Sequence, residues 1–424
     1  MTEGVSRRLA LKSLGATVAL AAGVAPFTVL GAKKPRVVVV GGGAGGATVA
    51  RYVAKSGQVD VTLVEANEHY TTCFFSNLYL GGFRSLESIT HSYDKLAAAV
   101  GVRVVTDIAT AVDADKRIVR LMSGGALAYD RLVLAPGIDF KYEAIEGYGP
   151  AAEQVMPHAY RAGAQSALLR RQIVDMKDGG LVVIVPPPNP FRCPPGPYER
   201  ASMIAHYLKY HKPKSKILIL DSKDKHSKQA LFQEAWERFY PGMIEWLPGE
   251  LTGGVKAVDV TNMAVVTEDE THRADVVNVI PPQQAGWIAR SAGAAAQSGW
   301  CPVQAHNLAS KLLPDVHVVG DSIIPGDMPK SAFAANSQAK VCANAIVADL
   351  ADKQAFRPRF RNTCWSLVAT GHGIKVGASY EATEEKIAKT SGFISQTGED
   401  DTTRAATANE ANGWYAGITA DLFG

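Results

Sequence analysis

Cysteines are the residues of this sequence best suited to redox and nucleophilic chemistry, and there are five of them. Cys193 lies in the loop PPPNPFRCPPGPYE (186–199), directly after the apolar run LVVIV (181–185). Such a run is typical of a buried parallel strand, which in a nucleotide-binding unit continues into a glycine-rich turn. Proline lacks an N–H donor and holds φ at about −65°, so this loop is unsuited to binding phosphate. We therefore expect the loop to hold Cys193 for chemistry, with a rigid surface loop as the alternative. The other four are Cys73, Cys301, Cys342 and Cys364.

A second candidate site is a glycine-rich turn near the start of the sequence. The run RVVVV (36–40) predicts a buried strand, and Gly41, Gly43 and Gly46 behind it form the pattern G-x-G-x-x-G. These glycines allow a tight turn, close approach of a pyrophosphate and close packing of a following helix. Glu65 ends the next predicted strand, where an acid can bind the adenosine ribose. We expect a dinucleotide site here; a turn that is merely rich in glycine is the alternative.

Two later stretches favour a flavin over a nicotinamide dinucleotide. The segment YDRLVLAPG (129–137) resembles the A-T-G strand motif of flavoproteins that have two dinucleotide-binding domains. The segment VHVVGD (316–321) resembles their second FAD motif, in which the aspartate binds the flavin ribitol. The resemblance therefore implies FAD as the cofactor. The residues of these two motifs that we expect to contact it are Ala135, Gly137, Gly320 and Asp321.

The same resemblance implies an α/β fold with two Rossmann-like dinucleotide-binding domains and a smaller C-terminal α+β domain, in keeping with a chain too long for one core. We expect the FAD domain to be split between residues 33–150 and 285–350, with residues 151–284 inserted. The inserted domain keeps the strands of a nicotinamide domain but lacks its phosphate-binding turn, so no NAD(P) binding is expected. Residues 351–424 should cover the flavin and contact a partner. Within them, we expect the polar stretch Thr390–Asn412 to form loops and a last short helix.

Three cysteine-containing segments carry a more specific resemblance. They are YTTCFFSN (70–77), FRCPPGPYE (191–199) and NTCWS (362–366). With these segments the mature chain resembles the flavoprotein subunit of flavocytochrome c sulfide dehydrogenase, and it is more distantly similar to sulfide:quinone reductases. The resemblance covers essentially the whole chain after the first 32 residues.

The resemblance implies a role for three of the cysteines. Cys73 corresponds to the cysteine that carries FAD through an 8α-S-cysteinyl bond; a free buried thiol is the alternative. Cys193 and Cys364 correspond to a redox-active disulfide beside the flavin, with Cys364 nearer the ring, although a bond between them could be merely structural. Glu199, six residues after Cys193, is a candidate proton acceptor. An acid stabilised by the N-terminus of a helix is the equally good alternative for Glu199.

The remaining cysteines and the histidines give no evidence for a further chemical site. Cys301 and Cys342 belong to no comparable motif and are interpreted as packed thiols. The histidines show no metal-ligand spacing, so no metal site is expected. No C-x-x-C-H sequence is present, so we expect no haem on this chain.

The first 32 residues are interpreted as a twin-arginine export signal. Arg7 and Arg8 precede the apolar stretch 14–25, which is too short and too rich in glycine for a permanent membrane helix. We therefore expect a periplasmic protein without stable membrane insertion. The net charge of +3 and the absence of a basic tract argue against nucleic acid as a partner. The polar stretch 391–412 lacks the apolar face of a membrane-bound C-terminal helix.

Together these observations predict an FAD-dependent sulfide dehydrogenase. Hydrosulfide would attack the Cys193–Cys364 disulfide, and the electrons would pass to a c-type cytochrome on another chain, in a heterodimer. Two alternatives stay open. One is the same chemistry with quinone as the acceptor, and the other is an accessory flavoprotein that restores a sulfur-oxidising partner by thiol exchange without turning over sulfide.

Overall fold

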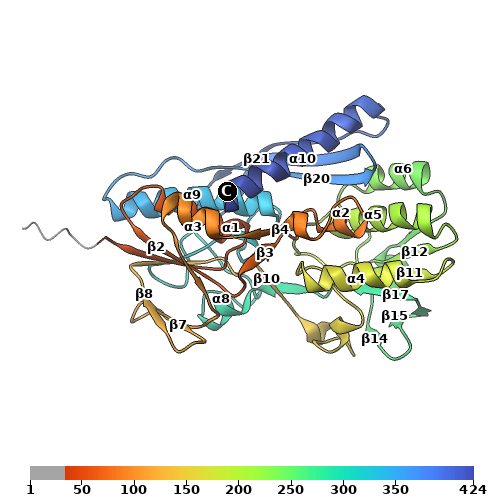
Figure 1. Ribbon diagram of the computed structural model, residues 1–424, viewed down its shortest axis with the longest axis horizontal. Helices are drawn as coiled ribbons and strands as arrows, with labels where there is room; N and C mark the ends of the chain where they lie inside the picture. Colours follow the sequence, from red (N-terminus) through yellow and green to blue (C-terminus); the bar gives the residue numbers. More distant parts are fainter. Residues whose placement is uncertain (1–33) are drawn as a thin grey trace, which may run out of the picture. The chain divides into compact units, whose positions relative to one another are not determined.

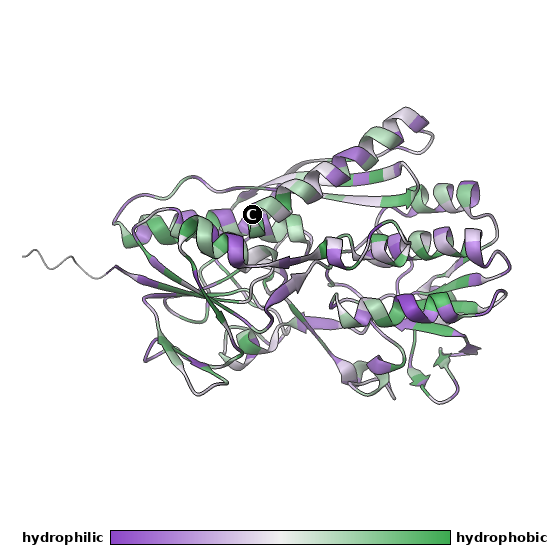
Figure 2. Ribbon diagram, in the orientation of Figure 1, coloured by the Kyte–Doolittle hydropathy of each residue, from purple (hydrophilic) through white to green (hydrophobic). Residues whose placement is uncertain are grey.

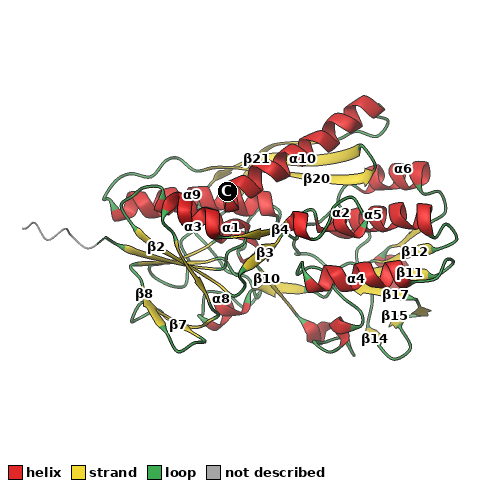
Figure 3. Ribbon diagram, in the orientation of Figure 1, coloured by secondary structure: helices red, strands yellow, loops and turns green. Residues whose placement is uncertain are grey.

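The computed structural model describes residues 34–424; the predicted export signal lies outside the described residues. Figures 1 and 3 show two parallel sheets that are each covered by helices, together with a long C-terminal helix, α10 (Asp401–Phe423). The strands of both sheets are mostly hydrophobic (Figure 2), as expected for strands that are buried on both faces. The predicted fold class, with two Rossmann-like domains, is confirmed.

The first parallel sheet has the strand order β19-β9-β1-β2-β5. Its strand β19 lies next to β9 in space but comes about 180 residues later in the sequence, so two distant segments build one sheet. Helices α1 and α9 pack against each other beside this sheet. The carboxyl ends of its strands meet at one edge, where ligands bind in open α/β sheets. The elements are β1 (Arg36–Val40), α1 (Ala44–Ala54), β2 (Asp60–Glu65), α3 (Asp94–Val100), β5 (Arg103–Thr106), β9 (Arg131–Leu134), β19 (Val316–Val318) and α9 (Ala332–Leu350).

The second parallel sheet has the order β13-β12-β11-β17. The chain enters it after β10 and leaves it through β18, and these two strands pair antiparallel. Its first strand, β11, has the bounds expected from the apolar run, and the proline loop leads from it into helix α5. The domain boundaries given above stay predictions. The elements are β10 (Ile138–Phe140), α4 (Ala164–Asp175), β11 (Leu181–Val185), α5 (Gly196–His211), β12 (Lys216–Leu220), α6 (Gln229–Phe239), β13 (Ile244–Leu247), β17 (Val276–Val279) and β18 (Gln283–Ala285).

The C-terminal part consists of an antiparallel sheet, β20 (Arg359–Ala369), β21 (His372–Ala382) and β22 (Ile387–Ile394), and helix α10 (Asp401–Phe423). The expectation of loops over Thr390–Asn412 is wrong, because half of this stretch belongs to a helix of 23 residues. The helix is rich in alanine, the best helix former. Its N-terminus is capped by the Asp400 carboxylate, which accepts a hydrogen bond from the Thr403 N–H at 2.7 Å. Polar composition alone therefore misled the prediction.

The remaining elements are short and lie around the two sheets. Among them, helix α2 matters most for the site, because it begins three residues after Cys73 and packs on α5. The short elements are β3 (His69–Thr71), α2 (Ser76–Leu80), β4 (Thr90–Ser92), β6 (Ala109–Asp113), β7 (Ile118–Leu121), β8 (Ala126–Ala128), α7 (Gly249–Thr252), β14 (Ala257–Asp259), β15 (Ala264–Val266), β16 (Thr271–Arg273) and α8 (Trp287–Ser291), with 3₁₀ turns at 87–89, 142–144, 152–154 and 320–322.

Candidate active site

A cavity of about 630 Å³ lies at the carboxyl edge of the first sheet and extends toward α5 and β20. This size is typical of a site for a small molecule or cofactor. With the exception of Gly46, every residue predicted to belong to the site lines this one cavity. Those that line it are Gly41, Gly43, Glu65, Cys73, Ala135, Gly137, Cys193, Glu199, Gly320, Asp321 and Cys364.

The glycine turn has the geometry that a dinucleotide requires. Gly41 has a φ of +98°, and a Cβ on it would lie 2.4 Å from the Ala135 carbonyl oxygen. Gly46 does not line the cavity, but a Cβ there would lie 1.8 Å from the Gly41 carbonyl oxygen, so it permits the close packing of helix and turn. Glu65 accepts a hydrogen bond from the Gly42 N–H at 2.6 Å. That contact places the carboxylate beside the turn, and its binding to ribose stays a prediction.

Asp321 brings to the cavity a carboxylate with one oxygen that lacks a hydrogen-bond donor. Asp321 Oδ1 is buried and makes no hydrogen bond to any described residue. A buried carboxylate oxygen without a donor is costly, and the hydroxyl of a ligand would relieve that cost. The glycine turn and Asp321 together therefore fit FAD at the two places where the sequence motifs predict it.

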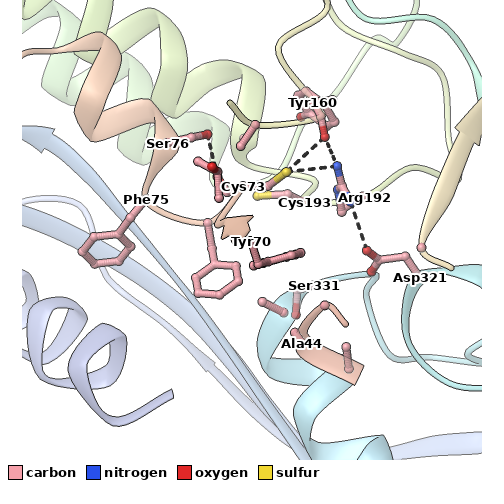
Figure 4. A pocket seen from close by; sticks show the side chains of 18 of the residues that line it. Ala44, Tyr70, Cys73, Phe75, Ser76, Tyr160, Arg192, Cys193, Asp321 and Ser331 are labelled. Carbon is pink, nitrogen blue, oxygen red and sulfur yellow. Dashed lines mark hydrogen bonds and ion pairs between the residues drawn. The ribbon is translucent and has the colours of Figure 1, made fainter. Parts of the chain in front are cut away.

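Cys73 and Asp321 are connected by one arginine. Arg192 Nη2 donates to Cys73 Sγ at 3.4 Å, and Arg192 Nη1 lies 3.6 Å from Asp321 Oδ2 (Figure 4). The Cys73 thiol also donates to the Tyr160 carbonyl oxygen at 3.1 Å. Cys73 thus lies on the same side of the cavity as the residue expected to bind the ribitol. Arg192 was not singled out from the sequence, although it directly precedes Cys193.

The structure brings Cys193 and Cys364 to the same cavity. Both are half-buried, and like the other three cysteines they are free thiols in the structure, so their disulfide stays a prediction. Cys193 has a φ of +57°, an uncommon conformation for a residue with a side chain. Its N–H donates to the Lys330 carbonyl at 2.8 Å and its carbonyl accepts from the Gly196 N–H at 2.7 Å, which fixes the strained loop. Burial raises the pKa of both thiols, and the Cys364 charge adds to the rise at Cys193.

Glu199 is half-buried at the start of α5, and both of its carboxylate oxygens accept hydrogen bonds. Oε2 accepts from Asn77 Nδ2 at 2.8 Å, and Oε1 accepts from the Leu367 N–H at 2.9 Å. Arg200 Nε donates to Asn77 Oδ1 at 3.1 Å, which turns the amide so that its NH₂ group faces Glu199. Burial raises the pKa of Glu199, although these donors oppose the rise. A carboxyl group with a raised pKa inside a cavity is suited to accepting a proton.

Lys228 is a second candidate functional residue, besides Arg192, that the sequence did not indicate. Its Nζ donates to Ser366 Oγ at 2.8 Å and to the Cys364 carbonyl oxygen at 3.1 Å. Burial lowers the pKa of Lys228 to about 8, while Cys364, Glu199 and Cys193 act in the opposite direction. A buried ammonium group is therefore held against β20, close enough to both thiols and the Glu199 carboxylate to interact with their charges. The residue lies in the segment KDKHSK (223–228), which reads as an ordinary solvated loop and offers no signal.

In the second sheet, the acid at the position where a nicotinamide domain would bind ribose is covered by other side chains. Asp221 follows β12, the place of a ribose-binding acid, but it is fully buried. Its carboxylate accepts hydrogen bonds from the Tyr198 hydroxyl, from Trp246 Nε1 at 3.1 Å and from Lys223 Nζ at 2.5 Å. The ring of His226 stacks on Tyr198 with 3.7 Å between centroids. The Asp221 carboxylate is thus already bound by side chains of the protein, and the expected absence of NAD(P) binding stays a prediction.

The described residues contain neither a cluster of metal-ligating side chains nor a membrane-spanning helix. Within residues 34–424 no group of three or more histidine, cysteine or acidic side chains could hold a metal ion. Over the same residues, no helix is long and apolar enough to cross a membrane.

Comparison with known proteins first defines the class. Residues 35–175 match the family model "Pyridine nucleotide-disulphide oxidoreductase". Residues 166–281 match "Sulfide dehydrogenase [flavocytochrome c] flavoprotein chain, central", and residues 356–423 match "Flavocytochrome c sulphide dehydrogenase, flavin-binding". The fold and the cavity are thus those of a two-domain, FAD-binding disulfide oxidoreductase. The chain belongs to the family of flavocytochrome c sulfide dehydrogenase flavoprotein chains.

Individual relatives agree with this family. The flavocytochrome c sulfide dehydrogenase flavoprotein chain of Chlorobaculum thiosulfatiphilum is 56% identical over 43 residues, which are 10% of this chain and 90% of that sequence. The mitochondrial sulfide:quinone oxidoreductase of Mus musculus is 24% identical over 325 residues, 71% of this chain and 68% of its own.

Solved structures share the fold. The sulfide:quinone oxidoreductase of Aquifex aeolicus superposes with a TM-score of 0.70 at 19% identity, covering 91% of this chain and 92% of its own. A NAD-dependent persulfide reductase from A. fulgidus has a TM-score of 0.61 at 15% identity, covering 89% and 77%.

Proposed function

We propose that this chain oxidises hydrosulfide with FAD and a Cys193–Cys364 disulfide, and that it passes the electrons to a c-type cytochrome subunit. Its family makes it an FAD-dependent oxidoreductase of the sulfide-oxidising class. The observation that carries the finer proposal is the convergence of Cys193, Cys364 and Glu199 on the cavity that also contains the glycine turn and Asp321. The side chains expected to react with sulfide thus lie beside the residues expected to hold FAD.

The first step needs only the protein's own residues. Hydrosulfide attacks one sulfur of the disulfide, the S–S bond breaks, and one cysteine becomes a persulfide while the other leaves as a thiolate. The persulfide proton passes to the Glu199 carboxylate, whose raised pKa suits it to hold a proton. The Lys228 ammonium stabilises the thiolate that leaves. FAD, when bound, supplies a centre that accepts two electrons and releases them one at a time.

We propose further that Cys73 attaches FAD covalently. This proposal is supported by the position of the Cys73 thiol, which lines the cavity near the start of α2. The thiol contacts the same Arg192 guanidinium that pairs with Asp321. A thioether at this point would keep the cofactor in an exported protein. Residues 1–32, which carry the expected twin-arginine signal, lie outside the described residues, and a periplasmic location is part of the same proposal.

Cys73→Ser is expected to leave the fold intact and release the flavin. Serine fills nearly the same volume but forms no thioether, so acid precipitation of the variant should leave yellow FAD in the supernatant. The wild-type pellet should retain it. Absorbance of the two supernatants at the flavin maximum checks this, and free flavin from the wild-type protein would contradict the covalent bond.

The proposed activity predicts that sulfide, and not NADH, reduces the protein. Under anaerobic conditions, stoichiometric sulfide should bleach the flavin absorbance, and added oxidised c-type cytochrome should become reduced. NADH and NADPH should bleach nothing, because Asp221 is buried and the proline loop offers no phosphate cradle. Reduction of a soluble quinone but not of cytochrome would favour the quinone-dependent alternative. Absence of any sulfide-dependent bleaching would favour the accessory thiol-exchange protein.

A further inference from the structure

A second cavity adjoins the first. It is bounded by the segment around and after α2, by the turn between β20 and β21, and by the middle of α10. Four residues line both cavities, so the wall between them is one residue thick. These four are Leu78, Leu367, Ala408 and Asn412.

The shared wall also carries the proposed proton acceptor. The Leu367 N–H donates to Glu199 Oε1 at 2.9 Å, and Asn77, which directly precedes Leu78, donates to Glu199 Oε2 at 2.8 Å. Cys364 lies three residues before Leu367 on the same strand, β20. The second cavity therefore approaches the first at the place where the thiols and the carboxylate gather, and not at the glycine turn.

One fixed positive charge lies in this second cavity. Among its lining residues Arg84 is the sole charged side chain, and no carboxylate of residues 34–424 lies within ion-pairing distance of it. Arg84 Nη2 donates to Asn412 Oδ1 at 3.0 Å. The guanidinium also lies over two aromatic rings, 4.8 Å from the centroid of Phe75 and 4.7 Å from that of Tyr415. An immobilised cation without an anionic partner is a site of attraction for a small anion.

We propose that the second cavity is the inlet for the anionic sulfur substrate, and that Arg84 draws hydrosulfide toward Cys193 and Cys364. This inference rests on the proposed function. FAD is expected to fill much of the first cavity, so a small substrate needs another approach to the disulfide. Two cations, Arg84 in the inlet and Lys228 beyond the shared wall, favour an anion along this path. A small opening of the wall at Leu78 and Leu367 would admit hydrosulfide.

The rate of flavin reduction tests the role of Arg84. Arg84→Gln should lower the second-order rate constant for bleaching by sulfide by about threefold at low ionic strength, typical of losing one charge on a partly hydrated approach. Its rate should also depend less on salt than the wild-type rate does. Arg84→Lys keeps the charge and should retain most of the rate. The matched control is Arg103→Gln, which removes the same charge from an exposed position on β5.

A second experiment measures how readily small reagents reach the two thiols, and it does not depend on turnover. After reduction of the protein, Cys193 and Cys364 are alkylated with iodoacetate, an anion, or iodoacetamide, which is neutral, and the products are counted by mass spectrometry. Arg84→Gln should lower the ratio of the iodoacetate rate to the iodoacetamide rate about threefold. Thr370→Trp, at an exposed position lining the second cavity, should slow both reagents by obstruction.

The possible results distinguish a failure of the inlet proposal from a failure of the proposed sulfide oxidation. If Arg84→Gln matches Arg103→Gln in rate, salt dependence and alkylation ratio, the inlet is wrong while sulfide oxidation stands. If sulfide does not bleach even the wild-type flavin, the proposed function falls and the inlet with it. A general slowing in Arg84→Gln with unchanged salt dependence and unchanged alkylation ratio would assign Arg84 a packing role and would also overturn the inlet.

Discussion

Cys193→Ser and Cys364→Ser should each abolish reduction of the bound flavin by sulfide while leaving FAD attached through Cys73. Either substitution removes the disulfide that hydrosulfide attacks, so no persulfide and no leaving thiolate can form. We expect a loss of at least about a thousandfold in the rate of bleaching, the scale seen when a nucleophilic centre is removed. Stopped-flow absorbance at the flavin maximum measures the rate, and acid precipitation shows whether FAD is still bound.

The alternative, a purely structural bond, predicts a different pattern. Closing a loop of this length stabilises the folded state by about 5 kcal/mol in the chain-entropy account, so its loss would lower the melting temperature and spare the rate. Rate and melting temperature are therefore measured on the same samples. Cys342→Ser is the matched control, because this buried thiol lies in α9 and does not line the cavity. Full sulfide turnover in both single variants would eliminate the disulfide mechanism whatever their stability.

The parts of this site that the sequence predicts are those set by local pattern. The run at residues 36–40 became β1 and the run at 181–185 became β11, because β-branched apolar residues and the turn residues behind them determine such strands locally. The sequence also predicts the roles of Gly41 and Gly46, because the turn at each position leaves no space for a side chain. The resemblance of the three cysteine segments implied that Cys73, Cys193 and Cys364 lie near one flavin, and in the structure all three line one cavity.

The parts that the sequence did not reveal depend on contacts across the fold. Asn77 and Arg200 hold Glu199 from α2 and α5, and nothing in either local sequence indicates a carboxylate partner. The sequence predicts only a short last helix where α10 has 23 residues, because the polar residues of this stretch obscure the helix-forming effect of its alanines and of the Asp400 cap. Lys228 is separated from Cys364 by 136 residues, and only the packing of α6 against β20 brings its ammonium group to the thiols.

Lys228→Met should slow the reduction of the flavin by sulfide by about tenfold or more, because the leaving thiolate loses the buried cation that stabilises it. The pKa of the Cys364 thiol is already raised by burial, and Lys228 opposes that rise, so its removal raises the pKa further. The rate at which iodoacetamide alkylates Cys364 in the reduced protein, followed against pH, measures this directly. Its midpoint should move to higher pH in Lys228→Met and stay unchanged in Lys386→Met, which removes a surface lysine paired with Asp327.

The pH dependence distinguishes this electrostatic role from a packing role. Because burial lowers the pKa of Lys228 to about 8, its charge is present below pH 8 and is lost as the pH rises through that value. The wild-type rate should therefore decline above about pH 8, whereas Lys228→Met should lack this decline. A buried ammonium is also costly to the fold, so Lys228→Met should keep or raise the melting temperature at pH 7. A slower enzyme with an unshifted thiol pKa, an unchanged alkaline decline and a lower melting temperature would mean that Lys228 supports the packing of α6 on β20 and takes no part in stabilising the thiolate.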